Sequence, residues 1–268
     1  NTPQVLIPKA NGTIFYKNEK ASIDASNSSQ GYVIVNYKGS SKKVKLQIHT
    51  PTKKVYTVTL NGGEEVFPLA CGNGEYTFNV LENIAEKKYS QVMSYTLNVE
   101  LENEFSAFLY PNQYVNFNKD TRAVGIAKEL VKSAKSDLEA VEIIFNYVVD
   151  TIEYDYDKAK TVKSGYLPNV DEILQLKKGI CFDYSAVMAT MLRTQKIPTI
   201  MEIGYANEIY HAWISVYTKE KGWISGVIQF DGYNWKIVDP TFADGDNKSE
   251  KIKSFINNSS NYSVEFKF

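Results

Sequence analysis

The chain has only two cysteines and two histidines, so few of its side chains could form a thiol–imidazole pair for nucleophilic catalysis. Cys181 follows Gly179 and Ile180 and opens a segment with apolar residues nearly all round, which predicts a buried helix. The unpaired N–H groups of a helix N-terminus stabilise a thiolate, the reactive form of cysteine. His211 opens a strand-like segment and is a candidate base. Each also has an ordinary explanation, as a small core residue or a hydrogen-bonded strand end.

Asp239 adds a third group with a defined direction. It ends a strand-like segment and precedes a proline, so a turn fixes the orientation of its side chain. Alone, it too would be read as an ordinary strand-end aspartate. Together, the chain has Gly-Ile-Cys at 179–181, then a helix stopped by Pro198, then His-Ala-Trp at 211–213, then Asp-Pro-Thr at 239–241.

These four elements, in this order, resemble the core of the transglutaminase-like superfamily. The resemblance covers roughly residues 140–242 and leaves the first 100 residues outside it. It implies a papain-like fold in which Cys181 is the nucleophile, His211 its base and acid, and Asp239 the residue that orients the imidazole. These roles agree with the general logic of a nucleophile, a base and an orienting group.

The chemistry implied by the resemblance is acyl transfer at an amide bond. Cys181 would attack an amide carbonyl to form a thioester, and His211 would protonate the leaving amine. Water would then give hydrolysis by a peptidase, amidase or deamidase. An amine such as that of lysine would give a protein cross-link instead. A protein or peptide substrate is therefore expected, with a cell-wall or surface component as one candidate, and no cofactor is required.

The oxyanion donors are less clearly marked. The backbone N–H of Cys181 is one natural donor. Gln175 lies six residues earlier, the spacing of the oxyanion glutamine in papain-like proteases, but it falls in an amphipathic helix, and a solvated helix face is the favoured explanation. Tyr154 and Tyr156 lie in a segment that often carries a tyrosine in this superfamily. Trp213 shares a strand face with the candidate base and either lines a substrate cleft or packs in the core.

The elements that must position these residues fall into two patterns. Residues 1–102 contain short β-branched and aromatic runs separated by glycine-containing turns, which predict an all-β immunoglobulin-like sandwich. Residues 103–118 are predicted to be a linker. Residues 119–268 are predicted to be an α+β domain. Its helices are expected at 120–134, in a segment that begins with a capping box at 136–139, from 169 to near Gly179, and at 181–196. Its strands are expected at 199–203, 211–217, 222–230 and 235–238. Residues 243–261 are expected to be mostly loop.

Composition excludes several other classes of protein. Thirty basic and 31 acidic residues give a net charge of -1, which argues against a nucleic-acid-binding protein. No apolar run is long enough to span a membrane. No Cys/His cluster has zinc spacing, and an acidic stretch at 244–247 lacks the order of a calcium loop, so no metal site is predicted. An asparagine-rich chain that begins without methionine fits a secreted or cell-surface bacterial protein, with its targeting segment absent.

Three functional hypotheses remain open from the sequence. The first is the Cys–His–Asp acyl-transfer enzyme, most simply a peptidase or amidase. The second is a non-catalytic binding or scaffold protein in which the β-rich domain binds a partner and the triad is vestigial. The third is an amide-processing relative that acts on glycans or small acyl donors. Specificity would lie in the loops 158–168 and 208–210, which carry no readable code.

Overall fold

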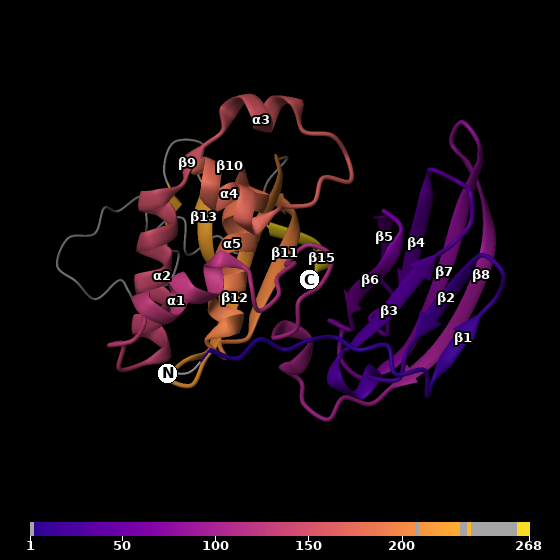
Figure 1. Cartoon of the computed structure of the whole chain (residues 1–268), viewed down its shortest axis with the longest axis horizontal. Helices are drawn as coiled ribbons and strands as arrows, with labels where there is room; N and C mark the ends of the chain where they lie inside the picture. Colours follow the sequence, from indigo (N-terminus) through magenta and orange to yellow (C-terminus); the bar gives the residue numbers. More distant parts are fainter. Residues whose placement is uncertain (1–2, 207–208, 231–234, 237–261) are drawn as a thin grey trace. The chain divides into compact units, whose positions relative to one another are not determined.

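The computed structural model describes residues 3–206, 209–230, 235–236 and 262–268 of the 268-residue chain (Figure 1). The chain divides into two compact units. One comprises Ile7–Gln113, and the other comprises Asn1–Leu6 together with Tyr114–Phe268. The short N-terminal segment belongs to the second unit, where the Gln4 N–H donates to the Thr194 carbonyl over 2.8 Å.

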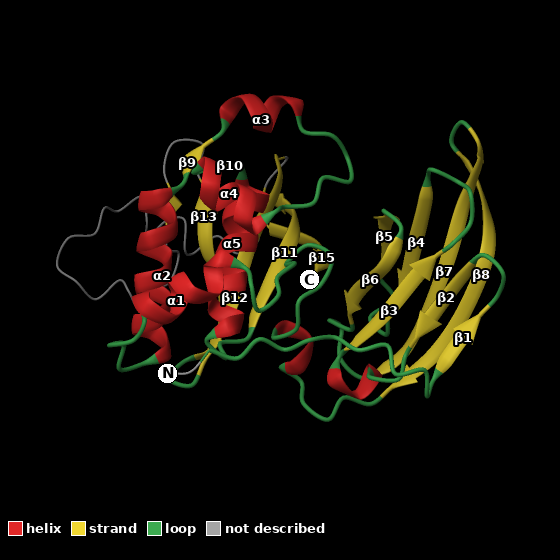
Figure 2. Ribbon diagram, viewed as in Figure 1, coloured by secondary structure: helices red, strands yellow, loops and turns green. Residues whose placement is uncertain are grey.

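The unit Ile7–Gln113 is all-β. Its strands form two four-stranded antiparallel sheets, with the orders β1-β2-β3-β6 and β5-β4-β7-β8 (Figure 2). The strands are β1 (Phe15–Lys17), β2 (Ala21–Asp24), β3 (Tyr32–Tyr37), β4 (Val44–His49), β5 (Val55–Leu60), β6 (Gly63–Pro68), β7 (Gly74–Ala85) and β8 (Lys88–Val99). Two short 3-10 helices lie at Ser28–Gln30 and Ser106–Phe108.

Side-chain alternation builds the core of this unit. In β4 and β5 every second residue is buried, as expected for strands with one face in a core. Leu46 and Phe78 of one sheet and Ile23 and Val33 of the other are all 0% exposed. Because each sheet hides one apolar face, the two hidden faces form a shared core. The all-β prediction is confirmed, and its immunoglobulin-like type stays a prediction.

The second unit is α+β, as predicted. Its five-stranded sheet has the order β14-β13-β12-β11-β15, and a separate two-stranded parallel sheet pairs β10 with β9 (Figure 1). The helices are α1 (Arg122–Leu130), α2 (Asp137–Thr151), α3 (Tyr156–Thr161), α4 (Val170–Leu176) and α5 (Cys181–Thr194). The strands are β9 (Glu153–Tyr154), β10 (Lys178–Gly179), β11 (Thr199–Ala206), β12 (Ile209–Thr218), β13 (Gly222–Phe230), β14 (Trp235–Lys236) and β15 (Tyr262–Lys267).

Helix α5 is the central helix of this unit. It contacts α1, α2 and α4 as well as β11 and β12, and all of its residues except Phe182 are buried. This confirms the buried helix predicted from its apolar residues. It ends at Thr194, two residues before the predicted end, and Lys196 adopts a left-handed conformation with φ 66.

The helix predicted from residue 169 ends earlier than expected. Asn169 caps α4, since its side chain accepts the Glu172 N–H over 3.2 Å, but the helix stops at Leu176 rather than near Gly179. The physical reason is strand β9, because the Glu153 N–H donates to the Lys177 carbonyl over 2.8 Å. The chain leaves the helix through a left-handed residue and becomes strand β10 immediately before the nucleophile helix.

Ser136 caps α2 as the sequence predicts, because its Oγ accepts the Glu139 N–H over 3.0 Å. The reciprocal bond differs from the predicted capping box. The Glu139 carboxylate accepts the N–H of Lys135 over 2.7 Å rather than that of the capping serine, so the acidic side chain satisfies a donor one residue further upstream.

A buried arginine joins the end of α5 to the sheet. Arg193 is 1% exposed, and its guanidinium donates to the carbonyls of Thr199, at 2.7 Å from Nη2, and Phe268, at 2.9 Å. These carbonyls belong to the chain that starts β11 and to the residue after β15. The side chain therefore fixes the helix that carries Cys181 against two strands.

We expect Arg193→Met to lower the free energy of unfolding of the second unit by about 2 kcal/mol, because buried carbonyls lose their charged donor. Urea titration followed by tryptophan fluorescence measures this directly, since Trp213, Trp223 and Trp235 all lie in that unit. Exposed Arg122 is the matched control, and Arg122→Met should change the stability by less than about 0.5 kcal/mol. Equal effects of the two substitutions would contradict this role.

Candidate active site

The thiol of Cys181 lies at the first residue of α5 and is only 6% exposed. Burial is the dominant influence on this group and raises its pKa to about 11. Backbone N–H groups of Ala212, Phe182 and Cys181 itself point toward the sulfur and lower the pKa, but by less. The contact with Ala212 places the thiol against strand β12, beside the residue that follows His211.

His211 is also buried, at 8% exposure. Among the described residues its Nε2 has no hydrogen-bond partner, and desolvation lowers the pKa of the imidazole to about 4. With the thiol pKa near 11, both groups are neutral at pH 7 in this arrangement. Both cysteines of the chain are free, so Cys181 is available as a thiol.

Asp239, the predicted orienting residue, lies outside the described residues. Its role therefore stays a prediction. What the described part does provide is a buried imidazole nitrogen that lacks a partner there. Buried polar atoms are normally hydrogen-bonded to protein or ordered water, so Nε2 is a position where a further partner is expected.

Strand β9 brings Tyr154 to the nucleophile. Tyr154 pairs with Gly179 across the parallel β9–β10 sheet, and the Asp155 N–H donates to the Gly179 carbonyl over 2.9 Å. Burial, followed by the charge that Cys181 carries when ionised, raises the pKa of Tyr154 to about 12. The phenol is therefore protonated throughout the physiological pH range.

The other predicted cleft residues lie in different surroundings. Tyr156 begins α3, is 52% exposed and packs edge-on against Tyr154 with ring centroids 4.9 Å apart. Gln175 is exposed on α4. Trp213 is buried, and its ring centroid lies 6.4 Å from that of His211.

Glu202 explains how Trp213 is held, and sequence reasoning did not identify it. The Trp213 Nε1–H and the Ser215 hydroxyl both donate to Glu202 Oε2, over 2.8 Å and 2.7 Å. All three residues are buried. Glu202 lies opposite Trp213 in the β11–β12 pairing, so this cluster joins the face of β12 that carries the imidazole to the neighbouring strand. The sequence signal that could have identified it is a glutamate inside the otherwise mostly apolar strand-like segment 199–203.

A second residue that sequence reasoning missed is Asp183, the third residue of α5. Its carboxylate is 0% exposed, and Oδ2 accepts the Ile180 N–H over 2.8 Å, which caps the helix. The side chain also packs against Gly179, where an added Cβ would lie 2.6 Å from Asp183 Cβ. The Asp183 side chain thus lies so close to Gly179 that a residue with a side chain would not fit at this position of the Gly-Ile-Cys motif.

We expect Gly179→Ala to destabilise the second unit by about 2 kcal/mol, because the new methyl group overpacks the buried cap. Gly125, in α1, is the matched control because a Cβ there meets nothing within 4 Å. Gly125→Ala should stabilise the same unit by roughly 0.5–1 kcal/mol through its higher helix propensity. Urea unfolding measures both, and a shift of the same sign in the two variants would contradict the close approach.

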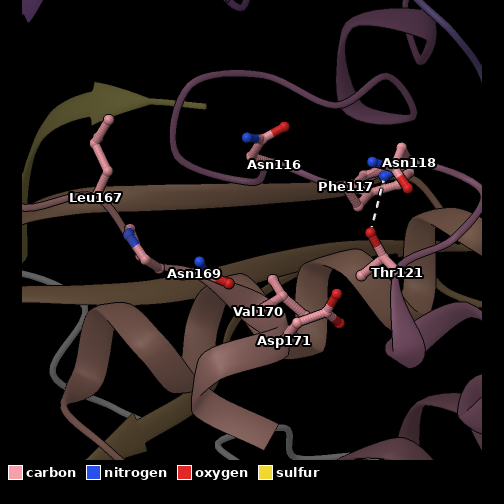
Figure 3. A pocket seen from close by; sticks show the side chains of 9 residues that line it. Asn116, Phe117, Asn118, Thr121, Leu167, Asn169, Val170 and Asp171 are labelled. Atoms are coloured by element: carbon pink, nitrogen blue, oxygen red, sulfur yellow. Dashed lines mark hydrogen bonds between the residues drawn. The ribbon is translucent and has the colours of Figure 1, made fainter. Parts of the chain in front are cut away.

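A polar pocket of about 350 Å³ lies elsewhere in the second unit and includes neither Cys181 nor His211. Figure 3 shows its walls, the segment 116–121 and the segment 167–171 that begins α4. Its polar side chains already serve local structure: Asp171 accepts the Arg122 N–H, and Thr121 accepts the Asn118 N–H. Within the described part of the chain, no three His, Cys, Asp or Glu side chains are grouped to hold a metal ion.

Sequence comparisons with known proteins give relatives that match only part of this chain. The chain is 30% identical over 94 residues to UPF0252 protein MJ1282 of Methanocaldococcus jannaschii, and 26% identical over 133 residues to the mouse kyphoscoliosis peptidase. These matches cover 31% and 45% of this chain but only 27% and 18% of those relatives. The periplasmic domain of TgpA from Pseudomonas aeruginosa shares 14% identity, with a TM-score of 0.36 over 78% of this chain and 92% of that one.

The family assignment rests on the segment that contains the candidate site. Residues 124–226 match the model of the transglutaminase-like superfamily. This range includes α5 with its buried cysteine and β12 with its buried histidine. It begins within α1 and ends within β13, so it lies inside the α+β unit and includes none of the β-rich region. The second unit of the chain therefore carries a transglutaminase-like domain.

Proposed function

We propose that the protein is a cysteine-nucleophile acyl-transfer enzyme that acts on amide bonds, in the first place a peptidase or amidase. The observation that carries the proposal is the position of Cys181. Its thiol lies at the N-terminus of a buried helix, under backbone N–H groups and against the strand residue next to His211. The mouse relative is named as a peptidase, which supports hydrolysis as the first candidate.

The proposed reaction uses Cys181 and His211 in two half-reactions. The imidazole takes the thiol proton, and the thiolate adds to the amide carbonyl. The imidazolium then gives its proton to the leaving amine as the carbon–nitrogen bond breaks, which leaves a thioester on Cys181. Water, deprotonated by the same imidazole, releases the acid and regenerates the thiol. An amine in place of water gives transamidation.

Asp239 completes this mechanism as the proposed partner of His211 Nε2. A carboxylate at that buried nitrogen favours the imidazolium and would raise the pKa of the imidazole from the value of about 4 that burial imposes. It would also hold the ring so that the other nitrogen faces the thiol. The unpartnered state of Nε2 among the described residues supports this assignment.

The proposed oxyanion donors are the backbone N–H of Cys181 and the phenol of Tyr154. Tyr154 is half-buried and stays protonated, and it pairs with Gly179, two residues before Cys181, across the β9–β10 sheet. Tyr156 is more exposed and packs against Tyr154, so it is proposed to support that ring. Gln175, exposed on α4, is the weakest of the predicted donors.

One observation favours the second candidate function, a non-catalytic binding protein with a vestigial triad. Burial holds the thiol pKa near 11 and the imidazole pKa near 4, so the described residues alone do not produce a thiolate–imidazolium pair. In that case the β-rich unit would bind a partner and the second unit would be structural. Chemical reactivity of Cys181 separates the two candidates.

The test uses 4-nitrophenyl acetate, an activated ester that does not require knowledge of the natural substrate. The protein is mixed with the ester, quenched in acid and digested, and acetylation of Cys181 and Cys71 is measured by mass spectrometry. Rapid, His211-dependent acetylation of Cys181 beyond that of Cys71 supports the enzyme. Acetylation no faster than at Cys71, or unchanged in His211→Ala, would overturn it in favour of the binding protein.

The substrate and location belong to the same proposal. A protein or peptide is the proposed substrate, and a secreted or cell-surface position is the proposed location. None of the helices formed by the described residues has the length and hydropathy of a membrane span. With denatured casein as a general substrate, new N-termini, ammonia release and incorporation of a fluorescent amine distinguish hydrolysis, deamidation and cross-linking.

A further inference from the structure

A buried carboxylate two residues after the nucleophile connects three separate parts of the second unit. Asp183 accepts the Ile180 N–H, and its Oδ2 also lies 2.7 Å from Lys158 Nζ. The hydroxyl of Tyr166 donates to Oδ1 over 2.5 Å. Lys158 Nζ is in turn 2.6 Å from the Tyr166 oxygen and 4.4 Å from the centre of its ring. We refer to Asp183, Lys158 and Tyr166 as the Asp183 node.

The node joins segments that are distant in the sequence. Lys158 lies in α3, Tyr166 lies in the loop that follows it, and Ile180 lies in the turn that leads into α5. The carboxylate is 0% exposed, while the Lys158 side chain is 29% exposed. The 156–168 segment is thus attached to the nucleophile turn through one buried acceptor group.

A helix cap alone does not require this arrangement. At this third helical position the side chain reaches back to the N–H of the capping residue, and an uncharged amide can accept that bond as well as a carboxylate can. A buried carboxylate with a cationic partner costs desolvation energy, and uncharged side chains of similar size often give equal or greater stability. A buried ion pair at this position is therefore better explained by an effect on its charged or reactive neighbours.

We infer that Asp183 is a positioning residue that fixes the turn carrying Cys181, and that Lys158 neutralises its charge so that a thiolate can form beside it. The inference rests on the proposed function, in which Cys181 reacts as a thiolate. It extends that function by assigning the 156–168 segment an electrostatic role at the nucleophile, in addition to the substrate specificity expected of the loop 158–168.

The sign of the electrostatic effect follows from the surroundings of the thiol. After burial, the Asp183 carboxylate is a further cause that raises the pKa of Cys181. The Lys158 ammonium lies against the same carboxylate and offsets that repulsion. Burial and the bond to Asp183 keep the pKa of Tyr166 far above its ordinary value, so Tyr166 remains a neutral donor. Among the described residues, the other titratable groups that interact electrostatically with the node or the thiol are Tyr154 on β9, Glu172 on α4 and Tyr210 on β12.

The experiment measures the pH dependence of Cys181 alkylation by iodoacetamide, with Cys71 as the internal reference. Lys158→Met keeps the aliphatic stem and removes the charge, and Lys158→Arg restores the charge. Lys160→Met is the matched control, since Lys160 is exposed in the same short helix. Hydrogen exchange of the 156–168 amides, measured on the same samples, reports whether the segment stays attached.

We expect Lys158→Met to shift the alkylation midpoint to higher pH and to slow the reaction at pH 7 roughly tenfold. Lys158→Arg should recover most of the rate, and Lys160→Met should match the wild type. Tyr166→Phe, which removes a donor without changing the charge, should speed exchange in 156–168 and shift the midpoint less than Lys158→Met does.

The inference is overturned if the alkylation profiles of Lys158→Met and Lys160→Met coincide, or if Lys158→Arg behaves like Lys158→Met. The first result would leave the node as a structural cap, and the second would show that the ammonium charge is not the operative property. Failure of the proposed function would look different. It would appear as a Cys181 that does not form an acyl-enzyme, whereas the midpoint of alkylation remains measurable in a protein without enzymatic activity.

Discussion

Replacement of Cys181 by alanine is expected to lower the rate of amide hydrolysis at least about a thousandfold. The remaining rate would be the one that substrate binding and the oxyanion donors provide on their own. The reason is that no second thiol can take over, because Cys71 lies in the other unit. The measurement is the appearance of new N-termini or ammonia from denatured casein.

Cys71→Ala is the control for this prediction. Cys71 is partly exposed in the β-rich unit, where its sulfur lies 3.3 Å from the Tyr56 hydroxyl. Its removal should leave the activity unchanged. If Cys181→Ala retained the wild-type rate, the nucleophile would be assigned wrongly. If neither the wild type nor the variants reacted with casein, the acyl-enzyme test with the activated ester would decide between an inactive protein and an unsuitable substrate.

Asp239→Ala is expected to slow alkylation of Cys181 at pH 7 about a hundredfold. Without the carboxylate, the thiol should titrate with the pKa of about 11 that burial gives it. At pH 7 only about one in 10⁴ of such thiols is ionised. A more basic thiolate is a stronger nucleophile, which recovers roughly 10²-fold of the lost rate, so the net loss is about a hundredfold. In the wild type, the proposed ion pair should place the midpoint well below the free-thiol value of about 8.5.

The acid stability of the same variant provides an independent measurement. With its folded pKa at about 4 and an ordinary value of 6.5, His211 stays neutral in the folded state while the unfolded chain takes up a proton. Stability therefore falls as the pH is lowered from 6.5 to 4, by about 3 kcal/mol in Asp239→Ala. Adding His211→Gln should remove this dependence, as measured by urea unfolding. Identical alkylation and stability profiles in wild type and Asp239→Ala would contradict the proposed triad.

The sequence was sufficient for the features that depend on local pattern. Strand alternation identified the β-rich region, and apolar periodicity identified α5 as a buried helix. Capping residues marked the starts of α2 and α4. The order of Gly-Ile-Cys and His-Ala-Trp identified the superfamily that the family model matches over residues 124–226. Each of these signals involves residues that are neighbours in the chain or in one element.

Only the tertiary structure decided which distant groups surround Cys181 and how strongly they act on it. Strand β9 brings Tyr154 to the nucleophile turn, and the loop after α3 brings Tyr166 to Asp183, across separations that no local pattern encodes. The helix position predicted a low thiol pKa, but burial outweighs the backbone donors and raises it. The physical reason is that desolvation depends on everything packed around a group, whereas a helix N-terminus depends only on the residues next to it.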